Sequence, residues 1–507
     1  MAMAMALRMQ SLFILSGFFF VNSFVIQEAT IKDIQHSFSQ NQLTSRQLVD
    51  FYLHQIQALN PKLHGVIEVN PDAGYEADKA DSIMKSKTKV GELNGIPVVL
   101  KDSINTKDRL NTTAGSYALL GAEVSGDAAV VKKLRNAGAV ILGKASMSEW
   151  CQFRSLKIPE VGAQEVDKLG VNPYVDSGDP YGSSSGSAIS VAANMVAVSL
   201  GTETNGSIIC PADHNSVVGF KPTVGLTSRA GVIPISPRQD SVVKKPICRT
   251  VSDAVYVLDA IVGFDPRDSQ ATEEASKFIP NGGYKQFLNK DGLTGKRLGV
   301  VRNPFSYFYD ESTAILAFEA HLNTLRQRGA ILVDNLEIEN IDIIMDPNEC
   351  GESTALLAEL KLNINEYLRE LTSSPVRSLA DIIAFNLNSS DLEKTDEYEQ
   401  EVFMASEMTN GIGEEERTAM EMLAILSRDG FEKLMKENEL DATVTLGPGM
   451  APVLAIGGYP GITVPAGYDE DGMPFGICFG GLRGMEPKLI EVAYGFEQPT
   501  MIRRPPA

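Results

Sequence analysis

The sequence predicts an α/β fold, a single large domain whose central β-sheet is covered by helices on both faces. Three observations support this prediction. Helical and strand periodicities alternate along the chain. The predicted strands, such as residues 96–100 and 139–142, are continuous apolar runs, which are typical of sheets buried on both faces. No linker or internal repeat divides the chain, and its 43% of hydrophobic residues suffices for a sizeable core.

The first predicted elements lie between residues 44 and 142. Thr44 or Ser45 is expected to cap a helix that Pro61 ends. The run 96–100 is predicted as a buried strand. A helical pattern then stops at Gly138, and residues 139–142 form the next predicted strand.

The later elements repeat this alternation. Buried strands are expected at 298–301 and 331–333, with a helix over about 312–328 between them. Residues 440–446 and 462–464 are predicted as late strands. The region from about 340 to 435 is helical and charged, and we interpret it as an insertion over the sheet.

The amino terminus differs from the rest of the chain. Arg8 precedes the apolar stretch 12–25, and Val21 and Ser23 are small residues suited to a cleavage site. This layout predicts a signal peptide over residues 1–23, a mature domain over 24–507, and a secreted or extracellular protein. The alternative is a buried N-terminal helix in a cytoplasmic protein. The stretch is short for a membrane span, and no later segment is apolar enough to be a membrane anchor.

Charge and cysteine content exclude several classes of protein. Lys and Arg number 45 against 65 Asp and Glu, a net charge of −20, which makes nucleic acid an unfavourable partner. The five cysteines are too scattered for a disulfide framework or a zinc site, so buried free thiols are favoured, with one or two bridges left open for a secreted chain. They are Cys151, Cys210, Cys248, Cys350 and Cys478.

One segment, residues 180–222, has the composition of a ligand-binding site. A Gly/Ser cluster at 182–187 and a second small-residue turn at 201–208 allow close approach of backbone N–H groups to a ligand. The uncharged run 188–200 between them is predicted as a buried helix that brings the two turns together.

A serine nucleophile in this segment needs a base. Residues 182–186 match G-x-S-x-G, which would make Ser184 the nucleophile of a Ser-His-Asp site. That motif must follow a strand, whereas residues 172–181 contain Pro, Gly and Asp. Neither downstream histidine, His214 or His321, fits the triad, so this alternative fails.

Lys101 is the other candidate base. A lysine works as a base only when neutral, and burial at the end of an apolar strand lowers its pKa. From its position alone, a lysine that snorkels to solvent or pairs with Asp102 is an equal alternative.

The chain resembles the amidase signature family in these segments taken together. The Gly/Ser cluster, the turn G-T-E-T-N-G-S-I at residues 201–208 and the upstream lysine occur in the family's order, and its two serines are separated by the same interval, 207 − 183 = 24. The segments that also match are 113–116, 143–150, 218–223 and 461–467. The resemblance covers most of residues 26–500 and is nearest to peptide amidases and plant amidase-like proteins.

The resemblance implies a mixed sheet and a role for each site residue. Lys101 would be the general base, Ser183 the proton relay on a cis peptide, and Ser207 the nucleophile. Ser184 would support the lysine by hydrogen bonding. The backbone N–H groups of Thr204, Asn205, Gly206 and Ser207 would form the oxyanion hole. The expected substrate is a small-molecule or peptide amide, and no metal or organic cofactor is implied.

Three departures from the family pattern raise the alternative of a weakened or inactive binding protein. Tyr181 stands where the family has glycine or cysteine, and Asn205 replaces glycine or aspartate. The segment 240–249 lacks the family's Gly-Pro and contains Lys244-Lys245 instead. Asn205 also begins a glycosylation sequon, as do Asn111 and Asn388. A third possibility is an amidotransferase component that acts on charged tRNA, which the acidic charge disfavours. The sequence predicts neither the particular amide nor the oligomeric state.

Overall fold

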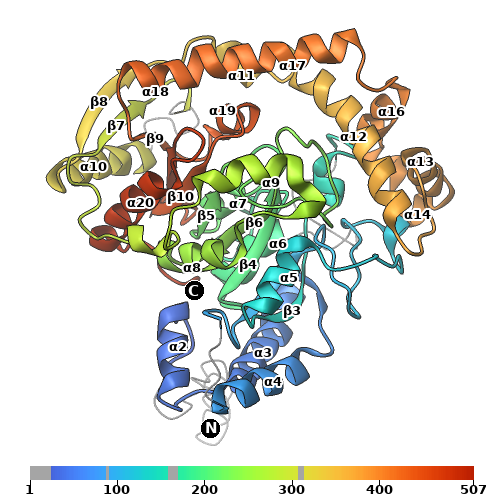
Figure 1. Ribbon diagram of the computed structural model, residues 1–507, viewed down its shortest axis with the longest axis horizontal. Helices are drawn as coiled ribbons and strands as arrows, with labels where there is room; N and C mark the ends of the chain where they lie inside the picture. The colour runs from blue at the N-terminus through green and yellow to red at the C-terminus, as the bar shows by residue number, and fades with distance from the viewer. Residues whose placement is uncertain (1–23, 87–90, 158–169, 306–312) are drawn as a thin grey trace, which may run out of the picture.

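The computed structural model describes residues 24–86, 91–157, 170–305 and 313–507, and its core is one mixed sheet. In the described residues the sheet has eleven strands in the order β1-β3-β2-β4-β6-β5-β10-β11-β9-β7-β8 (Figure 1). The strands are β1 (Val66–Val69), β2 (Pro97–Lys101), β3 (Val140–Ala145), β4 (Val198–Glu203), β5 (Val218–Lys221), β6 (Ser241–Cys248), β7 (Arg297–Val301), β8 (Ile331–Leu336), β9 (Ala442–Leu446), β10 (Gly461–Tyr468) and β11 (Pro474–Gly480). β2 is parallel to β3 and β4, and β7 to β8 and β9, while the other pairs are antiparallel.

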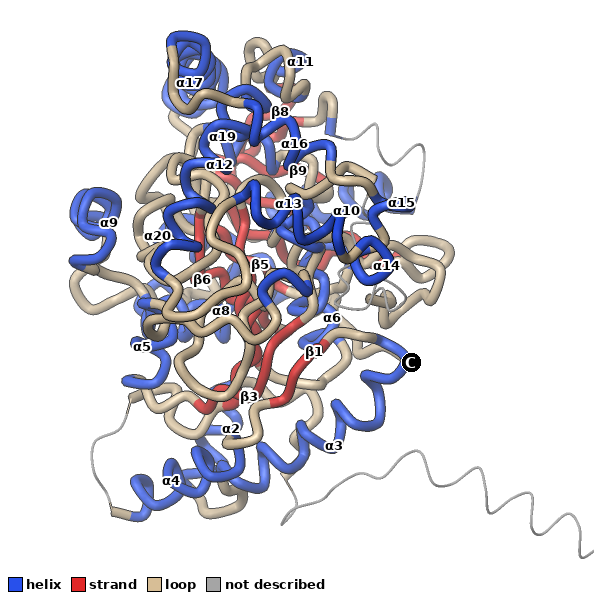
Figure 2. Tube along the Cα trace, turned by 90° about the vertical axis from the view of Figure 1, so that its right-hand side faces the viewer, coloured by secondary structure: helices blue, strands red, loops and turns tan. Residues whose placement is uncertain are grey.

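Helices cover both faces of this sheet, which runs through the middle of the molecule in Figure 2. The helices before the inserted region are α2 (Ile31–Ser39), α3 (Ser45–Leu63), α4 (Ala73–Lys85), α5 (Ala129–Asn136), α6 (Ser185–Ala192), α7 (Ile209–His214), α8 (Val251–Ile261), α9 (Ser269–Ala275) and α10 (Thr313–Gln327). Those that follow are α11 (Ile341–Met345), α12 (Glu352–Glu370), α13 (Leu379–Asn388), α14 (Ser390–Glu393), α15 (Thr395–Tyr398), α16 (Glu401–Met408), α17 (Glu414–Ser427), α18 (Lys433–Glu437), α19 (Ala451–Ile456) and α20 (Glu486–Thr500). Short turns of 3₁₀-helix include η1 (Tyr117–Leu119) and η2 (Glu149–Gln152). The predicted fold class, a single α/β domain with a covered sheet, is confirmed.

Local sequence signals account for the first elements. Thr44 caps α3 in a capping box with Gln47, and Pro61 lies in the last turn of that helix, close to its end at Leu63. Every residue of β2 and β3 is buried, as their continuous apolar runs predict.

The prediction for residues 188–200 was wrong in its second half. The helix α6 ends at Ala192, Asn194 takes a left-handed conformation, and the chain enters the strand β4 at Val198. β4 pairs with β2 on one side and β6 on the other, and these two ladders outweigh the helical pattern of a short apolar run. A short helix followed by a strand, rather than one continuous helix, therefore connects the two Gly/Ser turns.

The strand β8 also differs from its prediction. It lies at the edge of the sheet, and Ile331 is 49% exposed rather than buried. Periodicity cannot distinguish an edge strand from a central one, because both have apolar runs.

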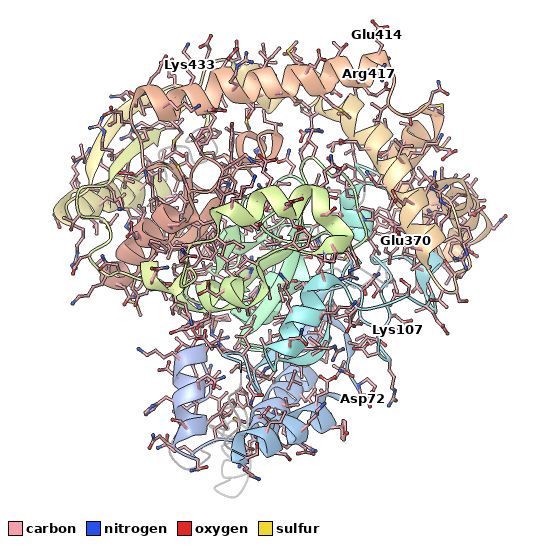
Figure 3. The ribbon with its side chains drawn as sticks, viewed as in Figure 1. Asp72, Lys107, Glu370, Glu414, Arg417 and Lys433 are labelled. Carbon is pink, nitrogen blue, oxygen red and sulfur yellow. The ribbon has the colours of Figure 1, made fainter. Side chains whose placement is uncertain are left out.

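The region 340–435 is helical, as predicted. Helices α12, α13 and α16 form one side of the molecule in Figure 1, and α17 and α18 run along its upper edge. Charged side chains lie on the periphery in Figure 3, among them Asp72, Lys107, Glu370, Glu414, Arg417 and Lys433.

Predictions about the chain end and the cysteines have different outcomes. The predicted signal peptide, residues 1–23, lies outside the described residues. None of the helices in the described ranges has the length and hydrophobicity that crossing a bilayer requires. All five cysteines are described, and each is a free thiol.

Candidate active site

Lys101 is the last residue of β2 and is completely buried. Its Nζ lies 2.6 Å from Ser183 Oγ and donates to the Thr202 carbonyl at 3.3 Å. Burial lowers the pKa of this lysine, against the opposing effects of Cys151, Glu203 and Asp240. A buried amine of this kind is suited to a neutral, proton-accepting role.

The carboxylate of Asp102, the residue after Lys101, faces the loop 113–115 and the strand β3. It accepts hydrogen bonds from the backbone N–H of Thr113 at 3.1 Å and of Gly115 at 3.3 Å. Its other oxygen lies 4.0 Å from Nζ of Lys144, a second buried lysine on β3. Lys144 itself donates to the carbonyls of Ile104 and Asn111, which gives it a structural role.

Ser183 lies between Lys101 and Ser207. It precedes α6, follows a cis peptide bond with Gly182, and is 2% exposed. Its Oγ lies 3.0 Å from Ser207 Oγ. Lysine nitrogen and two serine oxygens thus form one unbroken line of short contacts, and only the last, Ser207, is partly exposed.

The turn from Thr204 to Ser207 joins β4 to α7. Glu203 holds it from behind, because its carboxylate accepts hydrogen bonds from the backbone N–H of Ile208 at 2.8 Å and of Ile209 at 3.2 Å. The Thr204 hydroxyl donates to Asp240 at 2.6 Å, and Gly206 has a φ of +78°. Among the described residues, no protein acceptor receives a hydrogen bond from the backbone N–H groups of residues 204–207. Such unengaged N–H groups can bind an oxyanion.

Ser184 reaches Lys101 through a shared partner. Its Oγ donates to the Thr202 carbonyl at 3.1 Å, the same carbonyl that Lys101 contacts, and accepts from the Thr202 N–H at 3.3 Å.

The structure also decides against the Ser-His-Asp alternative. No strand precedes Gly182 within residues 170–181, where a nucleophile elbow would require one. Burial lowers the pKa of His214 to about 4, and its ring lies against Tyr181 with centroids 4.2 Å apart. His321 is a buried residue of α10, and its ring lies 2.6 Å from the Ala466 carbonyl oxygen.

A cavity of about 670 Å³ opens onto Ser207. Its lining beside Ser207 includes Gly182, Asn205 and Gly206, and α12 and α16 of the inserted region each contribute three further residues. The wall residues are Cys151, Gln152, Phe153, Leu156, Tyr181, Cys210, Pro347, Asn348, Ser353, Leu356, Leu357, Glu401, Val402 and Ala405. No group of three or more His, Cys, Asp or Glu side chains in the described ranges is arranged to hold a metal ion.

The three departures from the family pattern occupy different places. Tyr181 lines the cavity and packs on His214. Asn205 turns its side chain to Glu352, at 3.1 and 3.2 Å from the two carboxylate oxygens. Lys244 and Lys245 lie on β6, and their side chains are outside the described part of the structure.

Sequence reasoning missed the residues that support the site from distant segments. Glu352 and Asp240 have no motif that marks them, because their partners are 147 and 36 residues away along the chain. Glu203 was the residue most open to prediction, since it lies inside the turn at residues 201–208.

Comparisons with known proteins find relatives over most of the chain. A model of the Amidase family matches residues 47–490. A probable amidase of Arabidopsis thaliana is 60% identical over 96% of this chain and 92% of its own length. A putative amidase of Schizosaccharomyces pombe is 37% identical over 93% of this chain and 85% of its own length. The crystal structure of the peptide amidase of Stenotrophomonas maltophilia is 39% identical, with a TM-score of 0.87 over 95% of this chain and 98% of that one.

Proposed function

Because this chain belongs to the amidase family and is a hydrolase of amide carbon–nitrogen bonds, we propose that it works through an acyl-enzyme on Ser207, with Ser183 and Lys101 as the proton relay. The observation that supports this most is the line of contacts from Lys101 Nζ to Ser183 Oγ at 2.6 Å and to Ser207 Oγ at 3.0 Å. That line ends at a cavity large enough for a small amide or the end of a peptide.

Acylation begins with proton transfer. Neutral Lys101 takes the proton of Ser183, which takes that of Ser207 as the Ser207 oxygen attacks the amide carbon. The burial that lowers the Lys101 pKa maintains its neutral form without a histidine.

The turn 204–207 faces the substrate oxygen on which negative charge develops during the attack. Its backbone N–H groups have no protein acceptor within the described ranges, and Glu203 and Asp240 hold the turn in place from behind. One such donor is typically worth about 10²–10³ in kcat. Reversal of the relay then delivers a proton to the leaving nitrogen, so ammonia departs from a primary amide and an amine from a secondary one.

Water completes the cycle. It enters the position of the leaving group, gives a proton through Ser183 to Lys101, and its oxygen attacks the acyl carbon. The bond to Ser207 then breaks, the carboxylic acid leaves, and the proton returns from Lys101 through Ser183 to the Ser207 oxygen. The substrate is a small-molecule or peptide amide, which the largely hydrophobic walls of the cavity would bind beside Ser207.

A fluorophosphonate probe tests the assignment, because it forms a covalent bond with an activated serine. We expect labelling of the wild-type protein, none in Ser207→Ala, and a loss of at least about 10²-fold in labelling rate in Lys101→Met. Ser353→Ala is the matched control, since Ser353 lines the same cavity but lies outside the relay. Labelling that survives Ser207→Ala means that the nucleophile is misassigned, and a folded wild-type protein that never labels means a binding role without turnover.

A further inference from the structure

The turn that carries the proposed oxyanion hole is fastened to a helix far away in the sequence. Asn205 Nδ2 donates to both carboxylate oxygens of Glu352, at 3.1 and 3.2 Å. Glu352 is the first residue of α12 and is 3% exposed. Gln239 donates to the same carboxylate from the segment that precedes β6, and Gln239 is completely buried.

These hydrogen bonds hold the side chains of two consecutive residues of the turn. Asp240 accepts the hydrogen bond of the Thr204 hydroxyl, and its neighbour Gln239 binds Glu352, which binds Asn205. The side chains of Thr204 and Asn205 are thus held by protein partners, while their backbone N–H groups lack protein acceptors among the described residues.

The helix at the other end of this connection is part of the substrate cavity. Ser353, Leu356 and Leu357, all on the first turns of α12, line its wall. A substrate that binds against α12 therefore meets a surface tied directly to the oxyanion turn.

From these contacts we propose that Glu352 is a positioning residue, which fixes the oxyanion turn through Asn205 and couples it to the cavity wall on α12. The inference rests on the proposed function of Ser207. It also assigns a purpose to Asn205, since an amide can donate to the Glu352 carboxylate where an aspartate at the same position would oppose it.

A reciprocal exchange of donor and acceptor tests the pair. In Asn205→Asp two carboxyl groups face each other and share one proton at lower pH. Loss of that proton at alkaline pH makes them repel, so we expect kcat to fall as the pH rises, by about tenfold. In Glu352→Gln one amide nitrogen faces another donor, and displacement of the turn should lower kcat by about tenfold with KM changed less than about threefold. In the double variant, the amide nitrogen introduced by Glu352→Gln can donate to the carboxylate introduced by Asn205→Asp, while the new amide oxygen accepts from Gln239. We therefore expect the kcat of the double variant to lie within about threefold of wild type.

Glu359→Gln is the matched control. Glu359 is also a buried carboxylate of α12, but it pairs with Arg238 at 3.2 Å, and this variant should retain the wild-type kcat. If Asn205→Asp fails to fold, the same cycle is run with Asn205→Gly, in whose background Glu352→Gln should change kcat by less than about twofold.

Additive effects in both cycles, or full activity in Glu352→Gln, would overturn the inference. Failure of the proposed function is distinguishable, because it appears in the wild-type protein as fluorophosphonate labelling elsewhere than at Ser207. Thermal unfolding midpoints measured on each variant separate loss of stability from displacement of the turn.

Discussion

Arg154 is the cation on which the cavity-forming helices depend, and its replacement by methionine gives a direct test of that role. The guanidinium is completely buried and binds Glu149 at 2.6 Å, Glu393 at 3.1 Å, and the carbonyls of Glu393 and Glu399 at 2.6 and 3.0 Å. It thereby ties η2, which follows β3, to the short helices that precede α16. Methionine fills part of the volume but leaves the buried carboxyl groups of Glu149 and Glu393 without their cationic partner.

The expected loss follows from the burial of this cluster. Removing one partner of a buried ion pair costs about 3–5 kcal/mol. The unfolding entropy of a chain of this size is about 1 kcal/mol/K from roughly 2 cal/mol/K per residue, so the melting temperature should fall by about 4 °C. Because α16 supplies Glu401, Val402 and Ala405 to the cavity, KM should rise more than kcat falls.

The loss of stability should depend on pH in a definite direction. Burial, reinforced by Glu393, raises the pKa of Glu149 to about 8, so the folded state holds a proton that the unfolded chain releases above its ordinary pKa. The folded state then loses stability as the pH rises through this window. Without the opposing charge of Arg154 the pKa of Glu149 should rise further. The difference from wild type should therefore widen above about pH 8, where the wild-type folded state has lost this proton and the variant still holds it.

The assay is urea unfolding at several pH values, with amide hydrolysis measured on the same preparations. Arg302→Met is the control, since Arg302 also binds two carboxylates, Glu319 and Asp334, but near the surface, where we expect a loss of about 1 kcal/mol or less. A loss in Arg154→Met no larger than in the control, or a loss that shrinks with rising pH, would refute the reasoning.

Two further predictions concern pH and glycosylation. Because the proposed base must be neutral and burial lowers the pKa of Lys101, kcat/KM should rise with pH through that pKa, which a pH–rate profile checks. The rising part of the profile should persist in Asp240→Asn, because this variant removes the nearby carboxyl group whose pKa burial raises to about 6. When the chain is secreted from a eukaryotic host behind an added signal, Asn388 should carry a glycan because it is exposed at the end of α13. Asn205 and Asn111 should remain unmodified, because their side-chain amides donate hydrogen bonds to Glu352 and Glu68. A single mobility shift on deglycosylation, lost in Asn388→Gln, is the expected result, and a glycan mapped to Asn205 would contradict it.

Much of the fold was predictable because its signals are local. The Thr44 cap and the apolar runs of β2, β3 and β10 depend on neighbours within a few residues, and all form as predicted. β4 was not predictable from its own residues, because its conformation is decided by pairing with β2 and β6. The half-exposed edge position of β8 is likewise a property of the assembled sheet.

The candidate site shows the same division. Lys101, Ser183 and Ser207 stand in segments whose composition is unusual, so the residues themselves attract attention. Glu352, Arg154 and Asp240 are ordinary polar residues in the sequence, and only their burial and their distant partners reveal what they do. Charged residues acquire such roles through tertiary contacts, which a single sequence does not encode in any local pattern.

The separation of the cavity wall from the central sheet has an evolutionary consequence. The relay lies between residues 101 and 207, on and beside adjacent strands of the sheet, whereas much of the wall comes from residues 347–405. Substitutions in the wall can reshape the space offered to an acyl group while Lys101, Ser183 and Ser207 keep their spacing. Descendants of one ancestral hydrolase could therefore diverge in the amides they accept without a new way of breaking the bond, and a laboratory library confined to α12 and α16 would explore the same freedom.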